Sequence, residues 1–251
     1  MLIARFKYKS EEKYGIVDGE NTYLLKGSVF SDKIFKTGDI IKTESIKFFA
    51  PIQPSKIICA GLNYKDHAEE LKMALPQEPT LFMKPSTSVI GPGDEIRYPL
   101  QVKRLDYEAE LAVVIKKRTK DVEPDEAATY ILGYTCLNDV TARDLQKKDG
   151  QWTRAKSFDT FCPLGPYIAT DINPDNLKVQ LRVNDKVLQS SSTSNLIFKV
   201  KFLVSFVSKV MALLPGDVIA TGTPKGVGPL SKGDEVCVDI EGIGTLRNRV
   251  S

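Results

Sequence analysis

The sequence predicts an α+β fold dominated by strands, with a small N-terminal lobe ahead of a larger mixed β domain. Short apolar runs bounded by turn residues occur along most of the 251 residues, whereas helical spacing of apolar residues is confined to a few segments. Apolar residues make up 42% of the chain and charged residues 27%, so a core that folds without disulfides is expected. Many strands with few helices favour a mixed, strand-dominated core.

Residues 1–52 are interpreted as the N-terminal lobe and residues 53–251 as the main domain. The first part is dense in short alternating runs, and Asp18-Gly19 is typical of a hairpin turn. Two prolines, Pro51 and Pro54, bracket the expected junction. The strands expected in the lobe cover residues 2–8, 14–17 and 22–25.

Eight segments of the main domain are predicted to be strands, because each is a short apolar or alternating run next to turn residues. Two of them flank Asn184-Asp185 and are expected to form a hairpin. The predicted strands are 56–60, 81–84, 105–116, 133–138, 179–183, 186–189, 217–221 and 235–240.

Helices are expected in three places of the main domain. Residues 64–75 have helical spacing that Pro76 stops. Residues 124–131 are predicted to form a helix that leads into a strand. In residues 200–214 the apolar side chains recur at helical intervals, and Pro215-Gly216 follows.

Charge and cysteine usage exclude several classes of protein. The net charge is +3, from 35 basic and 32 acidic residues, so neither nucleic acid nor an anionic membrane is expected as a partner. The longest apolar stretch, 196–214, carries three lysines and is a poor membrane span. The four cysteines are scattered without a Cys-x-x-Cys pair, and residues 1–7 lack the apolar run of a signal peptide. A reduced, cytoplasmic chain without structural zinc is therefore expected.

Glu108, Glu110 and Asp139 are the candidate metal ligands. Residues i and i+2 of a strand point to one face, about 6.5–7 Å apart along the chain. The residues after Glu110 are apolar on both faces, which indicates a strand covered on both sides, so these carboxylates need a positive partner. Asp139 follows the predicted strand 133–138, and a third carboxylate there completes an all-oxygen set that favours Mg²⁺, Mn²⁺ or Ca²⁺ over zinc. Taken singly, the glutamates also fit a solvated strand face and Asp139 a turn.

His67 is the single histidine of the chain, and Glu70 lies three residues further on, so the two share one face of the predicted helix. Histidine is the side chain best suited to proton transfer near neutral pH, and a neighbouring carboxylate would fix its tautomer. The alternative is an exposed His–Glu pair without a chemical role.

Lys156 lies in a stretch that mixes charged and aromatic residues, from Trp152 to Asp159. A lysine near a metal site would hold a carboxylate or stabilise an enolate. The alternative is an ordinary surface lysine. The Gly-rich stretch 221–228 could present backbone N–H groups to an anion. It precedes Pro229 and no clear helix, so it is not a nucleotide-binding loop.

Seven short motifs occur together in one order along roughly residues 55–250. Each is weak alone, and the set of seven is specific. By these motifs the chain resembles the fumarylacetoacetate hydrolase family. They are GLNYKDH at 61–67, FMKP at 82–85, LDYEAEL at 105–111, NDVTARD at 138–144, AKSFD at 155–159, PGDVI at 215–219 and Gly222-Thr223-Pro224.

The resemblance implies a mixed β-roll core of that family's C-terminal type, usually in a homodimer, with a short variable N-terminal lobe. It implies Mg²⁺, Mn²⁺ or Ca²⁺ on Glu108, Glu110 and Asp139, and a catalytic dyad of His67 and Glu70 on a lid segment. Its substrates are 2-oxo acids or their enols, among them acylpyruvates, diketo acids, hydroxyheptadienedioate and oxaloacetate. Residues expected around the oxalate-like end of the substrate are Arg143, Gln146, Lys156 and Thr223.

Three reactions are compatible with such a site, because each passes through an enolate of a 2-oxo acid. Hydrolysis of a C–C bond in an acylpyruvate-type substrate is the first hypothesis. Isomerisation of a hydroxyheptadienedioate or decarboxylation of oxaloacetate is the alternative. A non-catalytic protein that binds small molecules on the same scaffold is the hypothesis from a different class.

Overall fold

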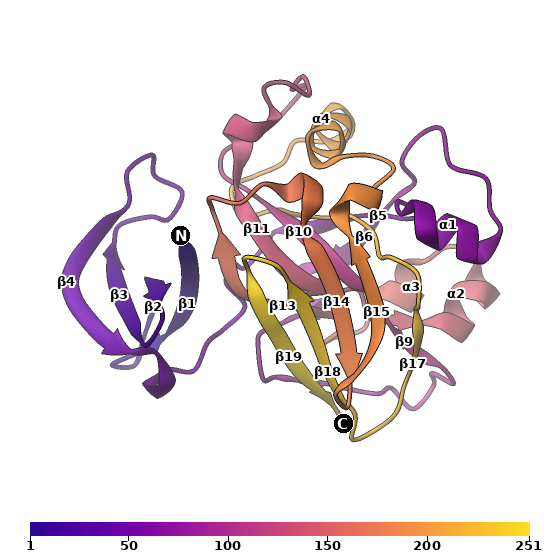
Figure 1. The fold of residues 1–251 in the computed structure, drawn as a ribbon, viewed down its shortest axis with the longest axis horizontal. Coiled ribbons are helices and arrows are strands. Elements are labelled where there is room, and N and C mark those ends of the chain that lie inside the picture. Colours follow the sequence, from indigo (N-terminus) through magenta and orange to yellow (C-terminus); the bar gives the residue numbers. More distant parts are fainter.

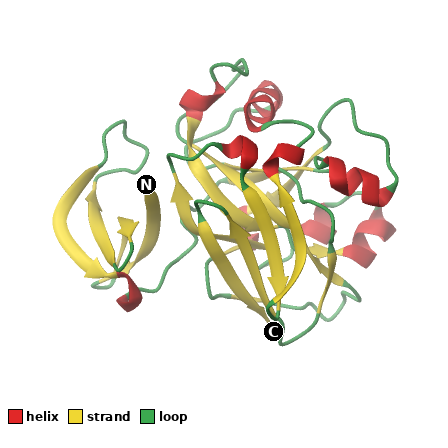
Figure 2. Cartoon of the chain, in the orientation of Figure 1, coloured by secondary structure: helices red, strands yellow, loops and turns green.

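Strands are the main ordered elements of the computed structural model, which describes all 251 residues (Figure 2). They form an 11-stranded, a five-stranded and a three-stranded sheet. Most pairs are antiparallel, but β5 (Lys56–Ala60) runs parallel to β16 (Val218–Ala220). The predicted strand-dominated, mixed fold is therefore confirmed.

The largest sheet carries the N-terminal strands at one end and the strand β6 at the other. Its order is β4 (Phe35–Lys42), β3 (Asn21–Lys26), β2 (Glu11–Asp18), β1 (Leu2–Tyr8), β13 (Cys162–Ala169), β11 (Ile131–Asn138), β10 (Ala109–Ile115), β16, β5 and β6 (Leu81–Pro85), with β7 (Val89–Ile90) on β13. The five-stranded sheet has the order β15 (Lys186–Ser192), β14 (Lys178–Val183), β18 (Glu235–Ile240), β19 (Gly244–Val250) and β8 (Glu95–Ile96). The small sheet has the order β12 (Thr141–Ala142), β9 (Leu105–Tyr107) and β17 (Gly228–Leu230).

Strands β1 to β4 stand beside the rest of the molecule, as Figure 1 shows. Their link to it is short, because β1 pairs with β13 through Leu2 and Ile3. The expected strands of the lobe fall within β1, β2 and β3, whereas β4 has mostly exposed residues and no apolar pattern that would predict it. The division of the chain after residue 52 stays a prediction.

Strand β10 is buried on both faces, as the sequence predicts. Leu111 and Val113 belong to the main core of 36 buried residues, which also takes side chains from β14, β18 and β19. Ala112 and Val114 belong to a second cluster of 16 residues, with side chains from β5 and β13. Burying one such Leu or Val is worth about 1.5–3 kcal/mol. A strand anchored on both faces is a rigid base for the residues at its end.

The helices are shorter than the sequence predicts. Helix α1 (Lys65–Leu71) ends early because Lys72 adopts a left-handed conformation, with φ at 54°. Helix α4 (Val200–Val210) ends before the predicted 214, and 124–131 contains only a 3₁₀ turn. Two short helices, α2 (Arg143–Asp149) and α3 (Thr153–Lys156), were not predicted. No helix is long and apolar enough to cross a membrane.

Candidate metal centre and active site

The predicted strand 105–116 is divided at Glu108 into β9 and β10. The N–H of Glu108 donates to the side-chain oxygen of Asn138 at 2.9 Å, and the N–H of Asp139 donates to the carbonyl oxygen of Glu108 at 2.8 Å. In the antiparallel pair of β10 and β11, Ala109 lies opposite Asn138. This register brings the two glutamates and Asp139 to the same end of the sheet.

The three carboxylates converge on one point. Each offers an oxygen, and these oxygens all lie within 4.8 Å of one another in buried surroundings. Glu110 also accepts a hydrogen bond of 2.7 Å from the N–H of Gly222. The convergent, all-oxygen donor set fits a hard divalent cation such as Mg²⁺, Mn²⁺ or Ca²⁺.

Two buried lysines contact the same carboxylates. The ammonium group of Lys156 donates to Glu108 at 2.9 Å and to Asp139 at 2.6 Å. Lys84 donates to the other oxygen of Asp139 at 2.5 Å. Lys156 was predicted as a site residue, whereas Lys84 was not. The available signal for Lys84 was a lysine inside the short apolar strand that carries one of the family motifs.

Arg143, the first residue of α2, connects several polar groups of the site. Its guanidinium donates to Glu108, to Asp106 at 2.8 Å and to Gln146 at 2.6 Å. The structure therefore places Arg143 and Gln146 beside the carboxylates, while their contact with a substrate stays a prediction. Asp106, which is fully buried, and Asn138 were missed because neither shows its long-range partner in the local pattern.

The charges around the site shift the pKa values of Glu108 and Glu110 in opposite directions. Burial acts to raise the pKa of Glu108, but the charges of Lys156 and Arg143 outweigh it and lower this pKa to about 2. Burial and the charges of Asp139 and Glu108 raise the pKa of Glu110 well above its usual value. Glu110 is thus the carboxylate whose charge is least compensated by the protein, and a bound cation would relieve it.

His67 and Glu70 form the predicted pair on α1. The Nδ1 atom of His67 lies 2.9 Å from a Glu70 oxygen, and the N–H of Gly226 donates to Glu70 at 3.0 Å. Because a carboxylate only accepts, Nδ1 donates in this pair and Nε2 is left as the free acceptor. The arrangement suits a group that takes or delivers a proton at Nε2.

These groups share one cavity of about 320 Å³. Its polar wall brings together one member of the predicted dyad, two of the three predicted metal ligands and the predicted substrate residues. Its outer wall is apolar and includes Leu71, Met73 and Trp152. The polar residues that line it are His67, Glu108, Asp139, Arg143, Gln146, Lys147, Lys156 and Thr223.

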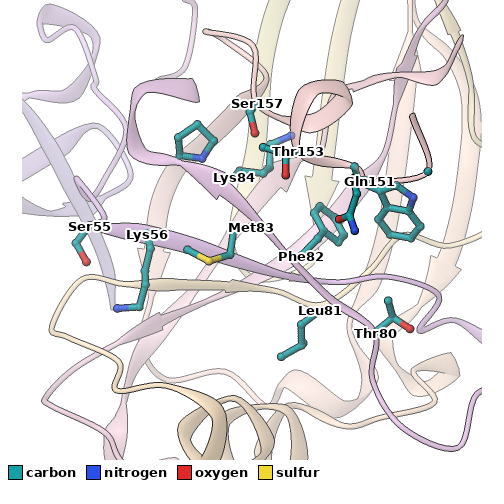
Figure 3. Close-up of a pocket in the computed structure, with 13 residues that line it drawn as sticks. Ser55, Lys56, Thr80, Leu81, Phe82, Met83, Lys84, Gln151, Thr153 and Ser157 are labelled. Carbon is teal, nitrogen blue, oxygen red and sulfur yellow. The ribbon is translucent and has the colours of Figure 1, made fainter. Parts of the chain in front are cut away.

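A second cavity of about 690 Å³ adjoins the first along β6 (Figure 3). Ser55 and Lys56 lie at one end of it and Thr80 at the other. Phe82 and Trp152 line both cavities, and their rings meet edge to face with centroids 5.2 Å apart. Although it is the larger cavity, no carboxylate lines it, so the chemistry belongs to the smaller one.

The strand-rich fold surrounds a buried cluster of three carboxylates whose oxygens fit a divalent cation. The model of the fumarylacetoacetate (FAA) hydrolase C-terminal domain matches residues 56–251, and that of the Rv2993c-like N-terminal domain matches residues 1–51. The chain belongs to the fumarylacetoacetate hydrolase family.

Named relatives include isomerases, a tautomerase and a hydrolase. The chain is 44% identical to the mitochondrial oxaloacetate tautomerase Fahd2a of Rattus norvegicus, over 84% of this chain and 71% of the relative. It matches the crystal structure of 2-hydroxyhepta-2,4-diene-1,7-dioate isomerase from Mycobacterium marinum with a TM-score of 0.93 and 42% identity, over 100% of this chain and 98% of that one. It matches fumarylacetoacetate hydrolase from Exiguobacterium antarcticum with a TM-score of 0.90 and 37% identity, over 100% and 99%.

Proposed function

We propose that this protein is a divalent-cation-dependent tautomerase or isomerase of 2-oxo acids, with oxaloacetate as the first substrate to test. The observation that carries the proposal is that one cavity is lined both by carboxylates of the candidate cation site and by His67. The tautomerase and isomerase relatives support this alternative more than the hydrolysis that the sequence analysis placed first.

The polar wall of the cavity suits the carboxylate and 2-oxo oxygens of such a substrate. A divalent cation on Glu108, Glu110 and Asp139 would polarise the 2-oxo group as a Lewis acid. The ammonium group of Lys156 offers a second positive contact to an oxygen that gains negative charge. Lys156 holds this charge firmly, because the charges of Asp139 and Glu108 raise its pKa above the usual value despite its burial.

His67 is the group we assign to proton transfer. In the keto-to-enol direction the C3 proton passes to Nε2, and the electron pair of the C–H bond becomes the C=C bond. The imidazolium then returns the proton to the carbonyl oxygen, so that no atom is gained or lost. Glu70 holds Nδ1 throughout, which keeps Nε2 directed to the substrate. Tautomerisation thus needs no attacking water, whereas hydrolysis does.

The test is a substrate panel with the purified protein in Mg²⁺ or Mn²⁺ and, as a control, in excess chelator. The panel consists of oxaloacetate, an acylpyruvate and hydroxyheptadienedioate. Ultraviolet absorbance follows the enol form of each. We expect metal-dependent acceleration of enol–keto exchange or isomerisation. Cleavage of the acylpyruvate alone would favour hydrolysis, the second candidate, which the Exiguobacterium antarcticum relative supports. Tight binding without turnover of any substrate would instead support a binding protein.

Two further expectations belong to this proposal. A homodimer is expected from the family, and light scattering of the purified protein would measure its mass against the 27.9 kDa of one chain. A cytoplasmic location is expected from the scattered, reduced cysteines, which are all free in the structure. Fractionation of cells that express the protein would test it.

A further inference from the structure

Gln189 joins the candidate cation site to the substrate-facing loop through one buried side chain. It lies on β15 of the five-stranded sheet and is only 1% exposed. Its Oε1 accepts a 2.9 Å hydrogen bond from the N–H of Ala109, the residue between Glu108 and Glu110. Its Nε2 donates to the carbonyl oxygen of Pro224 at 2.8 Å and to the hydroxyl oxygen of Thr223 at 2.9 Å.

The partners determine which way round the amide of Gln189 lies. A backbone N–H can only donate, so the atom facing Ala109 has to be the amide oxygen. A carbonyl oxygen can only accept, so the atom facing Pro224 has to be the amide nitrogen. A reversed amide would set nitrogen against N–H and oxygen against C=O. The second N–H of the amide is directed to the Thr223 hydroxyl at 2.9 Å, which is closer than the other acceptor near it, the carbonyl oxygen of Lys225 at 3.4 Å.

The orientation of the amide settles the role of the Thr223 hydroxyl. Its oxygen accepts from Gln189, and its own hydrogen finds no protein acceptor in the structure. Thr223 is 5% exposed and lines the 320 Å³ cavity together with Lys156. The free hydrogen thus has one place to go, which is an acceptor in the cavity.

We propose that Gln189 is a positioning residue that holds the Thr223 hydroxyl as a hydrogen-bond donor to an anionic oxygen of the substrate. The inference rests on the proposed function, in which that oxygen belongs to the carboxylate of a 2-oxo acid. This role accounts for the contact between Gln189, on the five-stranded sheet, and the loop that carries Thr223. The same side chain steadies the backbone between two metal-ligand candidates, so one residue relates the cation site to the carboxylate position.

Two substitutions of Gln189 remove its donation in different ways. Gln189→Glu replaces the donating nitrogen by an acceptor of the same shape, so the Thr223 hydroxyl turns to it. Gln189→Met leaves the Pro224 oxygen without its donor, and this oxygen then competes for the same hydroxyl. In both variants the cavity loses a donor.

The measurement is the dissociation constant of oxalate with Mg²⁺ present, by calorimetry, because oxalate carries the oxygens of the 2-oxo acid end and cannot turn over. A hydrogen bond to a charged group is worth about 1.5–3 kcal/mol, so we expect affinity to fall by about 10- to 100-fold. Thr223→Val should cause a similar loss, and each Gln189 change should cost clearly less affinity in the Thr223→Val background than in the wild type. The control Gln180→Glu, on the neighbouring strand β14 and outside this cavity, should bind oxalate normally.

Two results would overturn the inference. One is wild-type oxalate affinity in both Gln189 variants. The other is a Gln189 change that lowers oxalate affinity equally in the wild type and in Thr223→Val. Gln189 would then act through the fold and not through the Thr223 hydroxyl. Failure of the wild-type protein to bind oxalate at all would instead refute the proposed function on which the inference rests.

Discussion

The ammonium nitrogen of Lys84 lies 2.5 Å from one carboxylate oxygen of Asp139, and both side chains are fully buried. The other oxygen of Asp139 accepts from Lys156 at 2.6 Å. Lys84 comes from the last strand of the largest sheet and Lys156 from the short helix α3. The orientation of Asp139 therefore depends on two elements far apart in the sequence.

Replacing Lys84 should show that the negative charge of Asp139 is compensated both by this lysine and by a bound cation. Removing one partner of a buried ion pair costs about 3–5 kcal/mol, so Lys84→Met should lose that much unfolding free energy in chelator. Added Mg²⁺ should restore part of it, because a cation at Asp139 compensates the same charge. Urea unfolding with and without Mg²⁺ measures both effects.

The matched control for Lys84 is Lys56→Met. Lys56 on β5 pairs with the fully buried Asp217, which comes just before the neighbouring strand β16 and lies away from the carboxylate cluster. Its loss should destabilise the protein without any recovery on Mg²⁺ addition beyond that of the wild type. If the two variants respond alike to Mg²⁺, Asp139 is not a cation ligand.

Glu110→Gln should separate stability from cation binding. The variant removes a buried carboxylate whose charged form is disfavoured by burial and by Asp139 and Glu108. In chelator it should be at least as stable as the wild type. Mg²⁺ at 100 times its dissociation constant should stabilise the wild type by about 2.7 kcal/mol and the variant far less. Thermal unfolding of the wild type and the variant measures this difference, with Glu126→Gln at an exposed position as the control. If Mg²⁺ stabilises both proteins equally, Glu110 is not a ligand.

Gly222 should be sensitive to a single added methyl group. Its φ is +93°, and a Cβ there would lie 2.9 Å from the Cβ of Asn63. Its N–H also donates to Glu110. Gly222→Ala should therefore lower both stability and Mg²⁺ affinity. Gly233→Ala is the control, since Gly233 has a φ of +92° with nothing near its Cβ position. It should show only backbone strain of about 1–3 kcal/mol. Wild-type Mg²⁺ affinity in Gly222→Ala would argue against the contact with Glu110.

His67→Ala and Glu70→Gln test the proton-transfer dyad. General acid–base catalysis contributes about 10²–10⁴-fold, so tautomerisation should slow by a factor in this range. Oxaloacetate decarboxylation should be spared more, because it requires no proton removal at C3. Oxalate affinity should remain near the wild-type value. Glu69→Gln, the exposed neighbour on α1, is the control. Equal loss of both reactions in His67→Ala would mean that the dyad does not transfer the proton.

The strand-dominated class and most strand positions could be predicted from the sequence. The spacing of apolar residues along a short segment shows directly which of its side chains are buried. The same locality predicted Glu108 and Glu110 on one face and Asp139 at a strand end. The structure brings these three carboxylates together. Helix ends were predicted less well: residues 72–75 keep helical spacing, but Lys72 leaves the helix through a left-handed conformation.

The amino-acid sequence by itself predicted many of the strands, although not β4, β13 or β19, and placed the acidic residues at strand ends. Only the tertiary structure decided that Lys84 reaches Asp139, 55 residues away, and that Gln189 reaches Ala109, 80 residues away. The physical reason is that periodicity encodes the face on which a side chain lies, whereas its partner depends on the register and packing of whole sheets. The groups that compensate a buried lysine or glutamine are brought to it only when the sheets are assembled.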